Sequence, residues 1–109
     1  MKIEGVPFGT TDWTKVPETL HQGETGIAQW RTVHAGNVRV RLVTYAPGYR
    51  ADHWCSRGHI LFVLEGVLVT EIQDGATHTL SAGMSYQVSD GIDPHRSSTE
   101  TGARLFIVD

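Results

Sequence analysis

The sequence predicts an all-β protein, an antiparallel barrel or sandwich, and three observations lead to this fold class. Short runs of β-branched and aromatic residues recur from residue 25 onward. Clusters of Gly, Pro, Asn and Asp, which favour turns, separate these runs. No long segment places its apolar side chains at helical spacing. Short strands at regular intervals are typical of barrels and sandwiches.

Residues 1–24 are expected to form an irregular arm, because glycines and prolines interrupt every candidate periodicity there. The apolar side chains of the arm are expected to lie against the core; they are Val6, Phe8, Trp13 and Val16. The chain of 109 residues has the length of one domain, so residues 1–109 are expected to form a single unit.

Eight strand segments are expected along the rest of the chain. They are residues 27–33, 38–42, 59–65, 67–72, 77–80, 86–88, a segment around His95, and 105–108. A turn is expected at Glu65-Gly66, and Asp74-Gly75 predicts a hairpin. Apolar and basic residues alternate in 38–42, so Arg39 and Arg41 share one face. We expect these arginines to form salt bridges at a subunit contact or to line a pocket for an acidic ligand.

Composition excludes several classes of partner. Nine Lys and Arg against twelve Asp and Glu give a formal charge of −3, which provides no basic surface for nucleic acid or anionic lipid. The longest apolar run, residues 60–64, is far shorter than the roughly 20 residues that cross a bilayer. The single cysteine, Cys55, forms no internal disulfide and is typical of a reducing compartment. A cytoplasmic protein with a small-molecule ligand or substrate is therefore expected.

Three of the six histidines and the cysteine are placed to converge. On an extended strand His53 and Cys55 point to the same face, and a tight turn over residues 56–58 would bring His59 beside them. His95 joins if its strand is their neighbour in a closed barrel. Three imidazoles and a thiol suit a divalent first-row transition metal such as zinc, iron, nickel or copper, and suit calcium or magnesium poorly.

The segment around these residues resembles the first motif of the cupin superfamily. That motif is a glycine, then HxH, three or four residues, a glutamate, six residues and a glycine. Here Gly48 precedes His53 and Cys55, three residues separate Cys55 from His59, and six more lead to Gly66. Cys55 replaces the second histidine and His59 replaces the glutamate.

The second cupin motif, G, five residues, PxG, two residues and histidine, is similar to residues 83–95. Gly83 and Gly91 are in place, Ser89 replaces the proline, and His95 comes one residue late. Residues 51–55 (Ala-Asp-His-Trp-Cys) also resemble a small group of cupins named for a DHCW motif.

The resemblance implies a double-stranded β-helix, a jelly-roll-like antiparallel barrel, that binds a metal and forms a homodimer. Carried over position by position, it implies the ligand set His53, Cys55, His59 and His95. Whether Cys55 binds decides the kind of site. Three histidines alone leave an open position, as catalytic sites do, whereas a Cys-His₃ tetrahedron is closed for zinc.

Three functions follow from these alternatives. Similarity to other three-histidine cupins implies a dioxygenase-type oxidoreductase that acts on a small molecule. A closed site favours a non-enzymatic module that binds a metal or a small ligand. The third alternative is a barrel whose histidines form hydrogen bonds without any metal.

Overall fold

Strands make up almost all the regular structure of residues 2–109, which are the residues that the computed structural model describes. The strands are β1 (Glu18–Gln22), β2 (Ile27–Ala35), β3 (Val38–Tyr45), β4 (His59–Ile72), β5 (Thr77–Ser81), β6 (Ser85–Val88), β7 (His95–Ser98) and β8 (Ala103–Val108). Each strand pairing is antiparallel, so the all-β prediction is confirmed. Helix is limited in this part of the chain to one 3-10 turn at Trp13–Lys15, and no helix there is long and apolar enough to cross a membrane.

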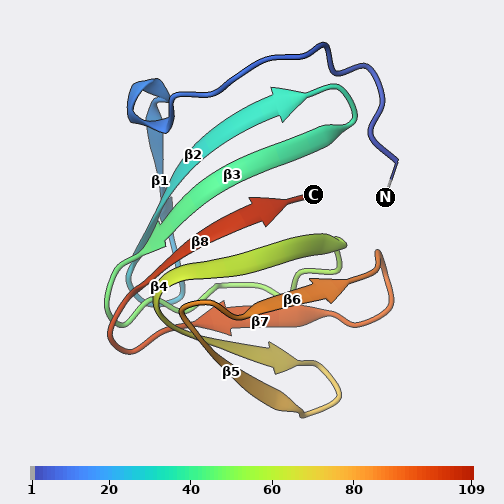
Figure 1. Ribbon diagram of the computed structural model, residues 1–109. Helices are drawn as coiled ribbons and strands as arrows, with labels where there is room; N and C mark the ends of the chain where they lie inside the picture. The colour runs from blue at the N-terminus through green and yellow to red at the C-terminus, as the bar shows by residue number, and fades with distance from the viewer. Residues whose placement is uncertain (1) are drawn as a thin grey trace.

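Strand β4 belongs to two sheets. Its first part pairs with β6 and β8, and that sheet continues from β8 through β3 and β2 to β1. Its second part pairs with β5 and β7. Figure 1 shows β4 lying between β8 on one side and β5, β6 and β7 on the other. The two sheets share this strand and enclose the core between them.

The turn predicted at Glu65-Gly66 is wrong, because β4 runs through this position without ending. A register shift between Val63 and Glu65 marks a β-bulge in the pairing with β8. Gly66 has a φ of 80°, and a Cβ atom there would lie 2.1 Å from the carbonyl oxygen of Gly102. The bulge and the glycine bend the strand from one sheet into the other. The residues that are typical of a turn therefore form a bend within one strand.

The N-terminal arm differs from its prediction in two places. Glu18–Gln22 is not irregular but forms the edge strand β1, whose side chains are mostly exposed and therefore show no apolar alternation. Trp13 packs edge-on against Phe106 of β8, with ring centroids 6.2 Å apart, as expected of an arm that contacts the sheet. Phe8 and Val6, however, are 98% and 40% exposed, so this part of the arm does not pack on the core as predicted.

The core lies between the two sheets and consists mainly of inward-facing residues of β3, β4 and β8, with Ala28 of β2 and Leu80 of β5. Its largest fully buried apolar side chains are Val43, Leu61, Val63, Leu68 and Leu105. Arg41, Thr70 and His95 are almost as buried. Buried polar side chains need partners, and Arg41 and His95 have them in Asp109 and His59.

Candidate metal centre

Backbone pairing brings Cys55 and His95 together. Residues 49–55 run antiparallel to β7, and the amide of Ala51 donates to the carbonyl of Ser97 at 2.9 Å. Cys55 and His95 exchange both of their backbone hydrogen bonds, at 2.8 and 2.9 Å. Directly opposed residues of an antiparallel pair present their side chains to the same face. The thiol and the imidazole therefore meet on one side of β7.

His59 completes the group from a third segment. It is the first residue of β4 and pairs with Val88 of β6. Its Nε2 atom lies 3.1 Å from Nε2 of His95. Within residues 2–109, Cys55, His59 and His95 form a group whose ligand atoms all lie within 4.8 Å of one another. Three of the four predicted ligands are thus neighbours in the structure.

The hydrogen bonds of the two rings determine which nitrogen atoms are free. Nδ1 of His95 lies 2.8 Å from the carbonyl oxygen of Asp93, and because a carbonyl only accepts, this Nδ1 carries the hydrogen. In a neutral ring the Nε2 lone pair of His95 is then free. Nε2 of His59 lies 2.7 Å from the hydroxyl of Tyr86. Burial raises the pKa of Tyr86, so this phenol keeps its proton at neutral pH.

Contact between the three side chains and their burial also shift the pKa values of these candidate ligands. The hydrogen bond with His95 lowers the pKa of the Cys55 thiol, although burial opposes this shift. The same contact raises the pKa of His95. Burial lowers the pKa of His59, more than Asp109 raises it. A lowered thiol pKa favours the thiolate, which is the form that coordinates a metal.

The three side chains fit a first-row transition metal. Two imidazole nitrogens bound to one ion at about 2.0–2.1 Å lie about 2.8–3.4 Å apart for octahedral to tetrahedral angles. The observed separation between the Nε2 atoms of His59 and His95 is 3.1 Å. A thiolate with two imidazoles is a donor set for zinc, iron, nickel or copper and a poor one for calcium or magnesium.

His53 lies outside this group. Its side chain is 75% exposed, and its Nδ1 atom lies 2.7 Å from a carboxylate oxygen of Asp52. The alternation that would have placed it beside Cys55 is broken, because four residue steps from Ala51 to Cys55 oppose only two steps from Ser97 to His95. The extra residues form a bulge that turns His53 outward. Its role as a ligand stays a prediction.

Asp109 is absent from the predicted set, yet its carboxylate is fully buried beside the site. Arg39 and Arg41 share one face as predicted, but their partner is this carboxylate of the same chain, at 2.9 and 3.0 Å. The one available signal was the alternation of β8, in which Asp109 has the parity of the buried Leu105 and Ile107. Although burial acts in the opposite direction, the attraction of His59 and the hydrogen bonds from Arg39 hold the pKa of Asp109 well below its usual range.

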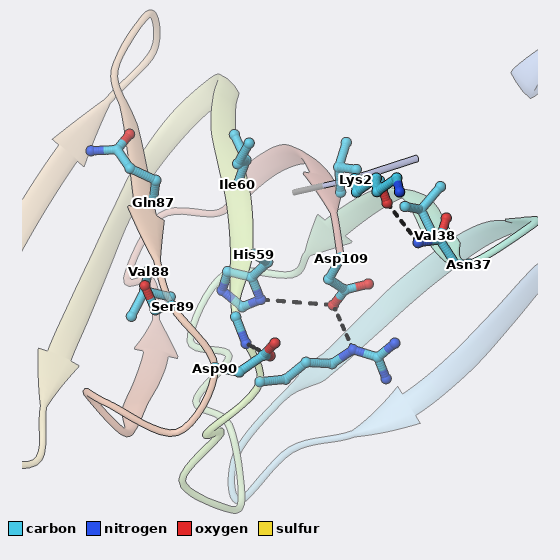
Figure 2. A pocket seen from close by; sticks show the side chains of 13 residues that line it. Lys2, Asn37, Val38, His59, Ile60, Gln87, Val88, Ser89, Asp90 and Asp109 are labelled. Atoms are coloured by element: carbon cyan, nitrogen blue, oxygen red, sulfur yellow. Dashed lines mark hydrogen bonds and ion pairs between the residues drawn. The ribbon is translucent and has the colours of Figure 1, made fainter. Parts of the chain in front are cut away.

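Two cavities reach the group. One of about 340 Å³ lies beside His95 and Tyr86 and is also lined by Thr70 and Leu80. The other, of about 810 Å³, is the more open of the two and reaches His59 and Asp109 (Figure 2). Within residues 2–109 the hydroxyl of Thr70 has no hydrogen-bond partner although it is fully buried. The smaller cavity therefore contains an unused polar group.

Substitution of Thr70 by valine is expected to stabilise the fold by about 1 kcal/mol, because it removes a buried hydroxyl that has no partner. Thr99 is the matched control, since it is also buried but its hydroxyl donates to the Val67 carbonyl at 2.6 Å and accepts from the Gly102 amide at 3.1 Å. Thr99→Val is expected to destabilise by about 1–2 kcal/mol. Urea denaturation measures both changes, and a loss of stability in Thr70→Val would contradict the assignment.

The fold is an antiparallel β-barrel, and a group of two histidines and a cysteine lies inside it. These two features place the protein in the class of small barrels with a candidate metal site. A family model described as a cupin domain matches residues 41–109, which include Cys55, His59 and His95. The chain belongs to the cupin family, as its two motifs indicate. The narrower resemblance to the DHCW group stays a prediction.

Solved structures support the same fold. A predicted oxalate decarboxylase from Thermotoga maritima matches with a TM-score of 0.78 and 13% identity, over 92% of this chain and 96% of that one. Ectoine synthase from P. lautus matches with a TM-score of 0.75 and 14% identity, over 93% and 76%. An RmlC-like cupin from Shewanella frigidimarina matches with a TM-score of 0.73 and 17% identity, over 96% and 88%. No curated protein sequence matches significantly. Similarity at these identities concerns the fold alone.

Proposed function

We propose that this cupin binds one divalent transition metal ion inside the barrel through Cys55, His59 and His95. The observation that carries the proposal is the approach of three ligand atoms from three segments to within 4.8 Å of one another. Zinc, iron and nickel all suit this donor set. When bound, such an ion supplies Lewis acidity and, in the case of iron, redox chemistry.

We propose further that the site is enzymatic and acts on a small molecule, with a dioxygenase-type oxidation as the reaction. Three protein ligands leave a coordination position open, as in catalytic metal sites. The cavity of about 340 Å³ beside His95 has room for a small substrate. In that cavity the Thr70 hydroxyl can hydrogen-bond a polar substrate group, and the Tyr86 hydroxyl can hold a proton. The reaction class rests on the resemblance of the two motifs to those of three-histidine cupins, in which Cys55 here takes the place of one histidine.

The alternative function is a non-enzymatic binding module, and the position of His53 favours it. His53 stands two residues before Cys55, on the segment that carries the thiol. A rotation of the exposed residues 52 and 53 that brought the His53 ring inward would add a fourth ligand. The resulting Cys-His₃ site would be closed for zinc.

Zinc titration of the metal-free protein, with a chelator as competitor, tests the proposal and separates the two functions. Wild type is expected to bind one zinc ion per chain. Cys55→Ser is expected to weaken zinc binding by at least about 10-fold, because a thiolate ligand is lost. His53→Ala is expected to leave the affinity unchanged, since that ring is 75% exposed and outside the group.

The outcomes have distinct meanings. An equal loss of affinity in His53→Ala and Cys55→Ser would support the closed site and the binding module. Failure of wild type to bind zinc, iron or nickel after reconstitution would contradict the metal site altogether. Elemental analysis of the same samples gives the stoichiometry.

We also propose that the chain forms a homodimer through the outer face of β4. Ile60, Phe62 and Leu64 alternate along that face and are 46%, 40% and 40% exposed. A contiguous row of exposed apolar side chains is typical of an interaction surface. Light scattering is expected to give the mass of two chains for wild type and of one chain for Phe62→Asp. A monomeric wild type would refute this assembly.

A further inference from the structure

A buried ion cluster lies immediately behind His59. The side chain of Asp109 is fully buried, and Arg39 binds it through two hydrogen bonds, Nε to Oδ1 and Nη2 to Oδ2, both 2.9 Å long. Arg41 donates to Oδ2 at 3.0 Å. The guanidinium groups of Arg41 and Arg39 lie 4.4 and 5.6 Å from the ring centroid of Trp30. The carboxylate is therefore held in place from two sides, and a bidentate arginine contact fixes its orientation.

The same oxygen, Oδ2, which also lies 3.6 Å from Nε of Arg57, faces the metal-binding histidine. Nδ1 of His59 lies 3.7 Å from Oδ2 of Asp109, and Figure 2 shows the ring and the carboxylate facing each other. Nδ1 is buried and has no hydrogen-bond partner within residues 2–109. The distance exceeds that of a normal hydrogen bond, so the interaction is an attraction between the negative carboxylate and the ring N–H. At a buried site such an attraction is weakly screened.

The opposite edge of the His59 ring has partners that favour a different tautomer. Its Nε2 atom lies 3.1 Å from the free Nε2 lone pair of His95 and 2.7 Å from the Tyr86 hydroxyl. With no charge behind the ring, a hydrogen on Nε2 of His59 would be favoured, because it could donate to His95. A hydrogen on Nδ1 instead leaves both Nε2 lone pairs facing each other, with Tyr86 donating to His59. Only this second tautomer can coordinate a metal through Nε2.

We propose that Asp109, held by Arg39 and Arg41, is a positioning residue that keeps the His59 hydrogen on Nδ1 and so leaves Nε2 free to bind the metal. This inference rests on the proposed metal site and adds to it a residue that touches neither metal nor substrate. Partners of this kind behind a ligating histidine orient the ring and increase its basicity. The cluster joins β3 and β8 to His59, the first residue of β4. The strands of the larger sheet therefore determine the position of this metal ligand.

Nitrogen NMR of the imidazole rings in the metal-free protein tests the inference without any metal. At a pH of about 8, where an ordinary imidazole is neutral, wild-type His59 is expected to carry its hydrogen on Nδ1. In Asp109→Asn the hydrogen is expected to move to Nε2, because the negative charge is gone. A purely structural role for Asp109 would leave the tautomer unchanged.

Zinc affinity provides the second readout. Asp109→Asn is expected to weaken zinc binding by about 10- to 100-fold, the usual effect of removing a partner behind a metal ligand. Glu65→Gln is the matched control, because Glu65 is also a carboxylate paired with an arginine, Arg104 at 3.7 Å, but is exposed and belongs to neither cavity. Its zinc affinity is expected to equal that of wild type.

The two hypotheses fail separately. One outcome is that wild type and Asp109→Asn bind zinc with equal affinity and carry the His59 hydrogen on the same nitrogen. This result would overturn the positioning role and leave the metal site intact. A second outcome is that wild type binds no metal but its His59 carries the hydrogen on Nδ1, and that this hydrogen moves to Nε2 in Asp109→Asn. This result would overturn the metal site and leave the positioning of His59 intact. Should Asp109→Asn not fold, the wild-type spectrum decides alone, since a hydrogen on Nε2 of His59 there refutes the inference.

Discussion

Replacement of His95 by alanine is expected to weaken zinc binding by at least about 100-fold, because it removes one of three protein ligands. A metal that binds only the folded state stabilises it by RT ln(1 + [L]/Kd). At a zinc concentration 100 times the wild-type Kd, wild type should gain about 2.7 kcal/mol, and a variant with 100-fold weaker binding about 0.4 kcal/mol. Urea denaturation with and without zinc measures both gains.

The gain on adding zinc is the quantity to compare, because His95 is only 2% exposed and its truncation leaves a cavity that destabilises the metal-free protein as well. His34→Ala is the control, since His34 is exposed on β2 and belongs to no ligand group within residues 2–109. It should show the wild-type gain. Equal gains in wild type and His95→Ala would mean that this ring is not a ligand.

Substitution of Gly66 by alanine is expected to destabilise the fold by about 2–5 kcal/mol. A left-handed backbone costs about 1–2 kcal/mol for a residue with a Cβ atom, and Gly66 has a φ of 80°. The added Cβ would also lie 2.1 Å from the carbonyl oxygen of Gly102. Relief of this overlap requires β4 and the start of β8 to separate, at a further cost of about 1–3 kcal/mol.

Gly75→Ala separates the two contributions. Gly75 also has a positive φ, 108°, but a Cβ atom there would meet nothing within 4 Å. Its substitution should cost only about 1–2 kcal/mol. Measured by urea denaturation, equal losses in the two variants would show that the approach of Gly66 to Gly102 carries no energetic weight.

The pattern of the sequence predicted most of the fold, and its errors have local explanations. Strand β3 was visible because apolar and basic residues alternate in residues 38–42. Strand β1 was not, because an edge strand with exposed side chains lacks that alternation. The sequence predicts a turn at Gly66 where the strand bends, because glycine is common in both and only the pairing partners of β4 distinguish them.

The candidate site, like the fold, is predicted in part by the sequence. Motif spacing selected Cys55, His59 and His95, which the structure places within 4.8 Å of one another. The same spacing placed His53 with Cys55, but the pairing of residues 49–55 with β7 includes a bulge that turns His53 to the surface. The position of a bulge depends on where the partner strand makes its hydrogen bonds. No residue type between Ala51 and Cys55 predicts it.

Short-range regularities of the sequence encode an all-β chain, the cupin motifs and the residue types that suit a transition metal. Which of those residues meet, and which side chains lie behind them, depends on the tertiary structure. Asp109 binds Arg41 across a separation of 68 residues, and His59 meets His95 across 36. Periodicity describes which side of its own strand a side chain occupies. Its neighbours on other strands depend on register and bulges, which the packing of the whole barrel sets.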